Sequence, residues 1–299
     1  MSRAIPTPTA SENLRGIAAM IASMAALIAN DALIKLAAAE LPTGEVIFLR
    51  GLLATLFLAG LVLASGGYAS LPSLASGRVA ARCLAEVGAT LLYLSALIRM
   101  PIADATAILQ FTPLAITAGA ALFLGAVVGW RRWLATLVGL AGVLIIIRPG
   151  ASAFNPYASL AVLAIAFIAA RDLLTRQLGH HVPTLLIALT SSASVAVASL
   201  GFLAFEHWQW PSPPALLSLT GAAVGVLGGQ YWIIVAMRTG DIAVVAPFRY
   251  SIILWAIAAG MLVWGEVPDL ATWTGIAIVT AAGLYTFLRE HRLARGARP

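Results

Sequence analysis

The chain has few charged residues for its length. Asp, Glu, Lys and Arg make up 10% of its 299 residues, against roughly 25% in a globular protein. Hydrophobic residues make up 61%, and the mean hydropathy is +0.95. So few charges cannot cover a surface that faces water, and we expect nearly the whole chain to lie in a lipid bilayer. This composition excludes a soluble domain carried on a single membrane anchor.

Several features of metal sites and enzymes are also missing. The single cysteine, Cys83, excludes an intramolecular disulfide and a multi-cysteine metal site. The sequence contains no HExxH motif, no Walker A loop, no Gly-x-Ser-x-Gly elbow and no aspartate-rich diphosphate motif. His180 and His181 are adjacent, so they cannot share a helix face. We therefore expect no metal, no cofactor, no ATP-driven step and no enzymatic activity.

What the sequence does contain is a series of long apolar segments. A helix that spans a membrane needs about 20 mostly apolar residues, and ten segments meet that length. The first 13 residues are polar and lack the apolar core of a secretory signal, so we expect the first segment to be retained. The segments are Leu14–Ala38, Gly44–Ser65, Gly77–Ile98, Ile102–Leu124, Trp133–Ile147, Pro156–Leu174, Thr184–Phe205, Pro213–Ala236, Ile242–Trp264 and Thr272–Leu288.

The basic residues predict the orientation of these segments. If the amino terminus is cytoplasmic, 13 basic residues lie on the cytoplasmic side and only Arg99 and Arg148 lie in outer loops. An excess of Arg and Lys on the cytoplasmic side is the usual topology signal. We therefore expect a multi-pass protein of the bacterial inner membrane with both termini in the cytoplasm, and no nucleic-acid partner despite the net charge of +6.

The second half of the chain repeats the first. Shifting the sequence by 139 residues superposes two apolar hairpins, and a shift of 141 superposes NDALIKL at 30–36 on RDLLTRQ at 171–177. Five helices per repeat is an odd number, so the second copy must start from the opposite side of the membrane. Inverted repeats of this kind are common in secondary transporters, with the substrate path between the halves. The residues paired by the 139 shift are Tyr93 with Trp232, Arg99 with Arg238, Gln110 with Arg249, Phe111 with Tyr250 and Thr112 with Ser251.

A ten-helix inverted repeat, a lysine late in the first helix, an arginine at the matching place in the sixth, and WGEVPDLATWTGIAIVTAAG at 264–283 together resemble a known family. The chain is similar to the EamA branch of the drug/metabolite transporter superfamily. Glu266 and Gly275 match that family's pattern in the second half. The first half has Gly125 and Ala126 where Gly-Glu is expected, which argues against an essential role for the glutamate.

The resemblance implies a fold and a function. It implies an all-α polytopic membrane protein in which two inverted five-helix repeats, residues 15–148 and 156–288, surround a central cavity lined mainly by helices three, four, eight and nine. It also implies alternating access and export of small metabolites. Within the branch the chain is most similar to the aromatic amino acid exporters, so we expect export of aromatic or neutral amino acids or similar metabolites. A monomer is possible, because GxxxG spacing is sparse.

Charged residues inside the predicted helices are the first site candidates. A charge at the bilayer centre costs about 2.5–3.5 kcal/mol, so such residues pair with one another or face a cavity. Asp31 and Lys35 share one helix face, with Arg50 on the next helix. They are either a structural pair near the membrane interface or a gate or ion-coupling site. Asp172 and Arg176 repeat the pattern in the second half.

Glu86 is a further candidate. It lies four residues after Arg82 and seven before Tyr93, so the three share a helix face. That face could line the substrate path, or Arg82 could simply neutralise Glu86. If the face lines the path, the Glu86→Gln variant should keep its stability while transport falls or loses its pH dependence.

The remaining candidates are aromatic and hydrogen-bonding residues at matched positions. Tyr93 and Trp232, with Gln230 beside two glycines, could line the cavity or belong to interfacial aromatic belts. Pro113 and Pro247 are expected to kink helices four and nine. The neighbouring residues could contact a substrate, with the Arg249 guanidinium taking a carboxylate, or Arg249 could extend to the interface. These neighbours are Gln110, Phe111, Arg249 and Tyr250.

We predict a secondary transporter for a small zwitterion with an apolar or aromatic side chain. Three alternatives stay open: a transporter of another small metabolite or drug, a channel or non-transporting scaffold, and an intramembrane enzyme. Saturation and counterflow would distinguish a carrier from the others.

Overall fold

In the computed structural model, all regular structure in the described ranges is helical. The described residues are 9–66, 74–124, 129–148, 155–178, 182–239 and 242–296. The helices are α1 Ala10–Ala37, α2 Thr43–Ala64, α3 Gly77–Arg99, α4 Ile102–Leu109, α5 Thr112–Leu124, α6 Trp130–Ile147, α7 Ala158–Gln177, α8 Thr184–Ser199, η2 Leu200–Ala204, α9 Pro213–Thr239, α10 Ile242–Val245, η3 Ala246–Tyr250, α11 Ser251–Ala259, η4 Gly260–Trp264 and α12 Leu270–Gly296.

These helices make ten segments that are long and apolar enough to cross a membrane. The predicted all-α, ten-helix polytopic fold is therefore confirmed. The fourth membrane segment consists of α4 and α5, and the ninth contains η3, α11 and η4. Each segment has more apolar residues than one packed helix face can hold. Many large apolar side chains therefore point outward, as expected for helices that contact lipid.

The fourth and ninth membrane segments are interrupted at matched places. Between α4 and α5 the chain leaves the α-helix at Gln110 and Phe111, and the equivalent part of the ninth segment is the 3-10 helix η3, which contains Pro247. Pro113 has no N–H to donate to the Leu109 carbonyl. The Thr112 hydroxyl donates to that carbonyl instead, at 2.6 Å. Both predicted helix irregularities are thus present.

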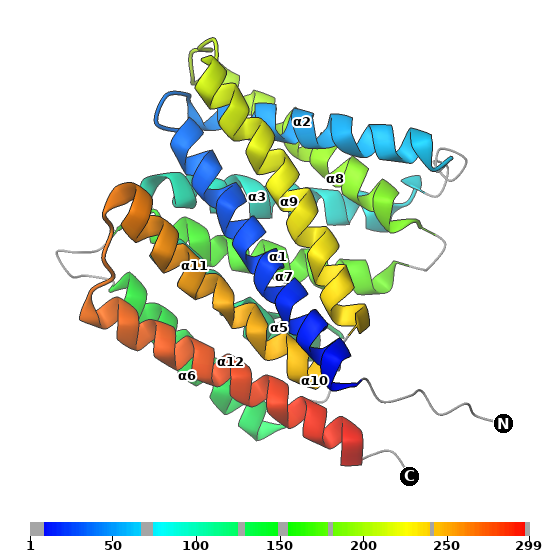
Figure 1. Ribbon diagram of the computed structural model, residues 1–299, viewed down its shortest axis with the longest axis vertical. Helices are drawn as coiled ribbons and strands as arrows, with labels where there is room; N and C mark the ends of the chain where they lie inside the picture. Colours follow the sequence, from blue (N-terminus) through cyan, green and yellow to red (C-terminus); the bar gives the residue numbers. More distant parts are fainter. Residues whose placement is uncertain are drawn as a thin grey trace.

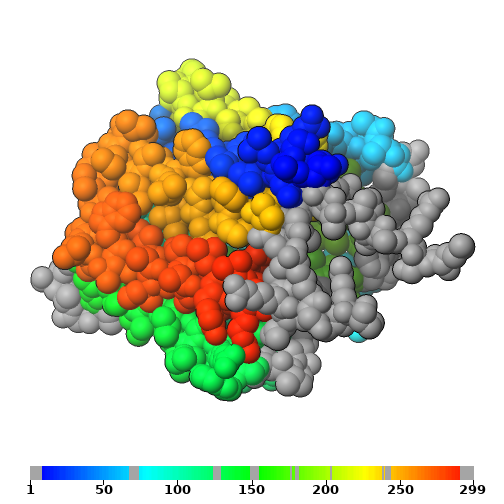
Figure 2. Space-filling model, turned by 60° about the horizontal axis from the view of Figure 1, so that its bottom comes forward, coloured from blue at the N-terminus to red at the C-terminus, as the bar shows by residue number. Residues whose placement is uncertain are grey.

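The packing of the helices is unchanged when the two halves are exchanged. α1 packs along α9, and its counterpart α7 packs along α3, which is the counterpart of α9. α2 packs on α8, and α6 packs on α12, so each of these helices contacts its own counterpart. Figure 1 shows α9 running from the top of the bundle to the lower right, across α3, which lies behind it. Figure 2 shows α1, α11 and α12 side by side, with α6 next to α12.

The helices of the bundle run between two ends. We call the end formed by residues 38–42, 100–101, 205–212 and 265–269 the tied end, which lies towards the left and top of Figure 1. The opposite end, where α1 begins and α12 ends, is the terminal end. Arg99 and Arg148, the two basic residues predicted for outer loops, both lie at the tied end.

The helix pair α1 and α9 is closely packed because α9 presents a row of glycines. Gly221, Gly225 and Gly229 are spaced four residues apart and all face α1. A Cβ added at Gly225 would lie 3.1 Å from the Ala26 carbonyl oxygen, and the Ser23 hydroxyl donates to the Gly229 carbonyl at 2.7 Å. Small residues let helix backbones approach closely in membranes. The prediction that GxxxG spacing is sparse is therefore wrong, and this row packs within one chain.

Candidate functional site

Charged side chains gather in the middle of the bundle, inside the membrane-spanning helices. They come from α1, α2, α3 and α7, and thus from both halves of the chain. Arg82 and Arg171, which were predicted among the 13 basic residues of the cytoplasmic side, lie inside the spans of α3 and α7 instead. The charged side chains form two neighbouring clusters with equal numbers of acidic and basic groups, described in turn below. Together we call them the central polar site. Its ionisable acids and bases are Asp31, Arg50, Arg82, Glu86, Arg171 and Asp172.

The first cluster surrounds Asp31 of α1. The Tyr93 hydroxyl of α3 donates to Asp31 Oδ2 at 2.6 Å, and the Asn30 amide donates to Asp31 Oδ1 at 2.7 Å. Arg50 of α2 donates from Nε to Asn30 Oδ1 at 3.1 Å. Asn30 therefore links the carboxylate to the guanidinium, so that neither charge is left without a partner inside the membrane.

The second cluster surrounds Glu86 of α3. Arg82 Nη2 lies 3.3 Å from Glu86 Oε2, and Arg171 Nη1 of α7 lies 3.2 Å from Glu86 Oε1. Arg171 also donates from Nε to Asp172 at 2.8 Å. The predicted pairing of Arg82 with Glu86 is therefore present, and a second arginine from the other half of the chain shares the carboxylate. Arg50 is within electrostatic range of both Asp31 and Glu86, and so connects the two clusters.

The position of these clusters favours a water-accessible interior. Glu86 is nine residues into α3, which places it about 14 Å along the helix axis, close to the middle of a hydrocarbon core about 30 Å thick. The Glu86 side chain is nevertheless 18% exposed and that of Arg171 is 26% exposed. A partly exposed ion network at this depth is expected to face a cavity rather than lipid.

A separate set of contacts joins the halves at the tied end. Lys35 of α1 lies 2.6 Å from Glu266 and donates to the Met100 carbonyl at 2.9 Å. Glu266 Oε2 accepts the Ile102 N–H at 3.1 Å, and Lys35 Nζ lies 4.8 Å from the ring centre of Trp264. The lysine side chain is only 10% exposed. This charged contact therefore connects α1, the start of α4 and the end of the ninth segment.

The local backbone explains how Glu266 reaches Lys35. The ninth segment ends in a π-helical turn, Gly260–Trp264, and Gly265 adopts a left-handed conformation with φ of 66°. Glycine adopts this conformation without the strain that a Cβ would cause. The turn reverses the chain, and the Glu266 N–H donates to the Gly260 carbonyl at 3.0 Å.

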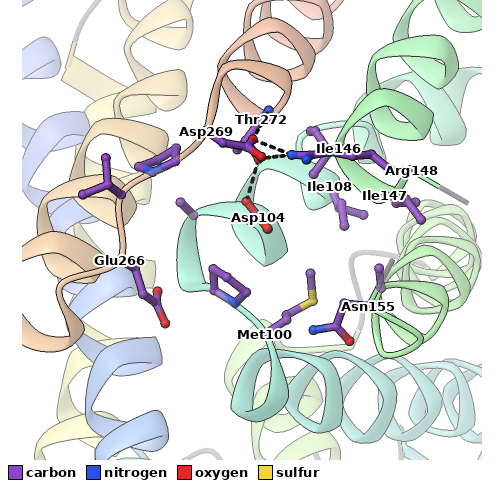
Figure 3. A pocket seen from close by; sticks show the side chains of 15 residues that line it. Met100, Asp104, Ile108, Ile146, Ile147, Arg148, Asn155, Glu266, Asp269 and Thr272 are labelled. Carbon is purple, nitrogen blue, oxygen red and sulfur yellow. Dashed lines mark hydrogen bonds and ion pairs between the residues drawn. The ribbon is translucent and has the colours of Figure 1, made fainter. Parts of the chain in front are cut away.

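A second charged contact lies across a cavity from the first. Arg148, at the end of α6, pairs with Asp269, which also accepts the Thr272 N–H at 2.9 Å and so caps α12. The Thr272 hydroxyl is 3.3 Å from Asp104 of α4. Figure 3 shows these four side chains converging on one side of the cavity, which has a volume of about 280 Å³, with Glu266 at another edge.

Asp269 is expected to stay charged in acid. Hydrogen bonds from Arg148 and from the Thr272 N–H lower the pKa of Asp269 to about 2. A lowered pKa stabilises the folded state above the unfolded pKa of about 4, and this contribution is lost as the pH falls through about 2. We therefore expect the Arg148–Asp269 ion pair to stay formed between neutral pH and pH 5. Asp269→Asn should therefore change the labelling rate of a cysteine placed at Ile108, in the cavity wall, by the same factor at both pH values. The ratio of variant to parent at each pH removes the pH dependence of the thiol itself, and a ratio that falls to one at pH 5 would contradict the prediction.

Loop contacts complete the closure of the tied end. The Ser212 N–H and hydroxyl donate to Glu40, and the Gln209 N–H donates to Glu45 at 2.9 Å. The Gly44 N–H in turn donates to Glu206 at 2.7 Å. Each of these bonds joins the first half of the chain to the second.

Glu266 and Asp269 of the tied end have no acidic equivalents in the other half. The counterparts of Lys35 and Arg148 under the 141 shift are basic, Arg176 and Arg289. Aligning Gly265 with Gly125 gives the counterparts of Glu266 and Asp269 as Ala126 and Gly129, which carry no charge. The terminal end therefore cannot be closed by the same two ion pairs.

Of the two predicted charge pairs, the pair of Asp31 with Lys35 is wrong, and the pair of Asp172 with Arg176 includes a side chain outside the described residues. Asp31 and Lys35 share a helix face but do not pair, because Tyr93 and Asn30 bind Asp31, while Glu266 and Met100 bind Lys35. Asp172 pairs with its neighbour Arg171. The side chain of Arg176 is outside the described residues, so its predicted role stays a prediction.

The aromatic candidates beside the interrupted helices lie against the α6 and α12 pair. Phe111 is half-buried and packs near Gly139 of α6. Tyr250 is half-buried, with its ring close to Gly283 of α12. Gln110, also half-buried, donates from its amide to the Thr106 carbonyl at 3.4 Å. Whether these side chains contact a substrate stays a prediction.

The candidates of α9 and η3 are more exposed. Gln230 and Arg249 are exposed, and Trp232 is 42% exposed. Trp232 lines a groove with Arg15, near the terminal end of α1. It is therefore not placed like its counterpart Tyr93, which is hydrogen-bonded to Asp31 in the central polar site.

Several residues of these sites were not predicted from the sequence. Arg171 and Asn30 are counterparts under the 141 shift, as are Ser191 and Arg50, and each of the four belongs to the polar contacts of the bundle. Comparing the polar residues of the two halves position by position would have indicated them. The sequence indicated Glu266 but no partner for it. In the structure it has two, the Lys35 ammonium and the Ile102 N–H.

The chain is similar to known proteins both in sequence and in fold. The model of the EamA-like transporter family matches residues 14–148 and 155–288, so the family's unit occurs twice. A solved crystal structure with 21% sequence identity superposes on the chain with a TM-score of 0.63, covering 95% of this chain and 98% of that one. This second similarity shows the fold alone.

Curated relatives are transporters of different metabolites. The chain is 32% identical to a riboflavin transporter of Vibrio cholerae over 72% of each chain. It is 26% identical to an S-adenosylmethionine uptake transporter of Rickettsia felis, over 93% of this chain and 94% of the relative. It is 30% identical to the pseudopaline exporter CntI of Pseudomonas aeruginosa, over 88% of this chain and 92% of the relative.

Proposed function

Because this chain belongs to the EamA-like transporter family of the drug/metabolite transporter superfamily, we propose that it is a secondary transporter that moves a small metabolite by alternating access. The observation that carries this proposal is the closure of one end by contacts between the two halves, above a partly exposed ion network in the middle of the membrane. A substrate that binds between inverted repeats can be released to either side when the halves rock against each other.

The arrangement of the tied end supports alternation between two states. Its charged contacts all bridge the halves, so they must break when that end opens. The symmetry-related acids are absent, so the state closed at the terminal end requires other contacts. The central polar site lies between the two ends, as a shared binding site requires.

For the substrate, we propose a small zwitterionic metabolite, and retain aromatic and neutral amino acids as the first class to test. The predicted similarity to the aromatic amino acid exporter YddG implied this class. The relatives named above handle riboflavin, S-adenosylmethionine and pseudopaline, which favours a wider class. They also include both uptake and export, so the family does not fix the direction.

The orientation of the chain in the membrane and the boundaries of its two repeats are also proposals. We propose both termini in the cytoplasm of a bacterial cell, the tied end facing outward, and repeats at residues 15–148 and 156–288. We propose no enzymatic activity, since the relatives are transporters. A channel or a scaffold would be an alternative, but a tied end closed by contacts from both halves favours a carrier.

Counterflow in proteoliposomes tests the function. Vesicles loaded with a panel of amino acids, riboflavin or S-adenosylmethionine should accumulate the labelled form of the true substrate transiently, with a rate that saturates. A carrier that has released labelled substrate inside binds the excess unlabelled substrate there and returns loaded with it, so the label stays inside for a time. Empty vesicles and vesicles with the Lys35→Ala protein serve as controls. Flux that never saturates and shows no counterflow would indicate a channel.

A further inference from the structure

The Glu86 carboxylate is bound in the way that a substrate carboxylate would be. Its two oxygens face two different guanidiniums, Arg82 on Oε2 and Arg171 on Oε1, which come from the two halves of the chain. Each arginine gives one nitrogen to Glu86, Nη2 of Arg82 and Nη1 of Arg171, and a guanidinium has enough donors to hold a carboxylate and a second partner at once. The pair is therefore built to take one carboxylate between the halves.

The two arginines do not depend on Glu86 for their positions. Arg82 donates from Nε to the Thr175 hydroxyl at 3.1 Å and from Nη1 to the Ser191 hydroxyl. Arg171 donates from Nε to Asp172 at 2.8 Å. Each guanidinium thus keeps its own support from α7 or α8 and would stay in place if Glu86 moved away.

Glu86 itself is held loosely. Its contacts of 3.2 and 3.3 Å are longer than the 2.7–2.9 Å typical of a charge-assisted hydrogen bond. Arg82 is on the same helix, four residues away, so this contact does not hold Glu86 against another helix. Glu86 also has another cation within electrostatic range, Arg50 of α2. A free carboxylate with better geometry can therefore compete for the two arginines.

The symmetry of the fold shows that these charges are not needed to pack the helices. The pair α3 and α7 is the counterpart of the pair α9 and α1. Under the 139 shift, Arg82 and Glu86 correspond to Gly221 and Gly225, which pack directly on α1. The same helix pairing therefore forms with glycines, and the charges of α3 are an addition to one half.

The geometry points to a carboxylate-binding subsite in which the carboxylate of the transported metabolite displaces Glu86 from Arg82 and Arg171. This inference rests on the proposed transport function and narrows its substrates to metabolites with a free carboxylate. Phe167 of α7 lies one turn before Arg171, packs against Gly88 and is 36% exposed. It provides an apolar wall beside the arginines for the rest of the substrate.

Binding of matched acids and amides to the purified protein tests the subsite. The probes are L-phenylalanine with L-phenylalaninamide, and 3-phenylpropanoate with 3-phenylpropanamide, measured by calorimetry in detergent. The wild type should prefer both acids. Glu86→Gln removes the competing carboxylate, so its affinity for the acids should rise about tenfold while that for the amides stays the same. Arg171→Lys keeps the charge but loses the fork, so its affinity for the acids should fall about tenfold.

Matched controls separate these effects from general ones. Glu12→Gln makes the same change in the exposed capping box of α1, where glutamine also caps, and Arg78→Lys changes an exposed arginine one turn before Arg82. Both should bind like the wild type. Equal binding of acids and amides, or unchanged or weaker acid binding by Glu86→Gln, overturns the subsite. If Glu86→Gln does not fold, an unchanged acid preference in Arg171→Lys overturns it.

The subsite and the transport function can fail separately. Saturable counterflow of a metabolite without a carboxylate, unaffected by Arg171→Lys, would leave the carrier intact and overturn the subsite. Acid-selective binding without counterflow of any panel member would support the subsite and count against transport.

Discussion

The Glu266→Ala variant is expected to expose the cavity behind Lys35 to water from the tied end. Glu266 accepts from Lys35 at 2.6 Å and from the Ile102 N–H at 3.1 Å, and it is the only acid that the structure places on Lys35 among the described residues. Hydrogen bonds to charged groups contribute about 1.5–3 kcal/mol. Loss of about 2 kcal/mol from the closed state would raise the population open at the tied end roughly thirtyfold.

Labelling of a buried cysteine measures this change. Ile108 is fully buried in the wall of the tied-end cavity, so a cysteine there should react slowly with a membrane-impermeant maleimide in a Cys83→Ala background. Glu266→Ala should accelerate the reaction roughly thirtyfold. Asp269→Ala is the matched control: Asp269 is 53% exposed, and an exposed pair contributes only about 0–1 kcal/mol. Equal rates in Glu266→Ala and the parent would show that the contact does not keep this end closed.

The Gly225→Leu variant is expected to separate α1 from α9 and lower the stability of the whole bundle. A Cβ at this position would already lie 3.1 Å from the Ala26 carbonyl oxygen and 3.4 Å from the Asn30 backbone nitrogen. A leucine must therefore push two helix backbones apart, and overpacking of this kind costs about 1–3 kcal/mol or more. The displacement would also move Asn30, which links Asp31 to Arg50.

Gly228→Leu is the matched control for this prediction. It makes the same substitution three residues away in α9, where an added Cβ would meet nothing within 4 Å. Heating the purified protein in detergent and following its monodispersity should show Gly225→Leu unfolding at a markedly lower temperature than the parent, and Gly228→Leu unfolding close to it. Similar midpoints for the two variants would mean that the glycine row does not determine the packing of α1 on α9.

The helices and their inverted order could be predicted from the sequence, because both depend on local signals. Twenty apolar residues specify a membrane span, and an odd number of spans per repeat specifies the inversion. Pro113 and Pro247 mark the interrupted helices because a proline removes a backbone donor wherever it occurs. The spans, the inversion and the interrupted helices could all be predicted without knowledge of tertiary contacts.

The partners of the charges could not be predicted in the same way. The i, i+4 spacing of Asp31 and Lys35 shows that they share a helix face, but helix packing decides which neighbours reach them. Tyr93 is 62 residues from Asp31 and Glu266 is 231 residues from Lys35. For Arg82 and Glu86 the local spacing did predict the pair, yet Arg171 had to come from another helix.

The balance of charge in the central polar site bears on how the membrane potential acts on the protein. Three carboxylates, Asp31, Glu86 and Asp172, stand with three guanidiniums, Arg50, Arg82 and Arg171, so the formal sum is zero. Each elementary charge moved through the field gains or loses about 2.3 kcal/mol per 100 mV. The charges also cancel within each half, since the first half carries Asp31, Arg50, Arg82 and Glu86 and the second carries Arg171 and Asp172. A rigid displacement of the halves therefore moves no net charge of this network through the field. The empty carrier should therefore return at a rate that is independent of voltage, whereas a cargo with net charge would make its own step electrogenic.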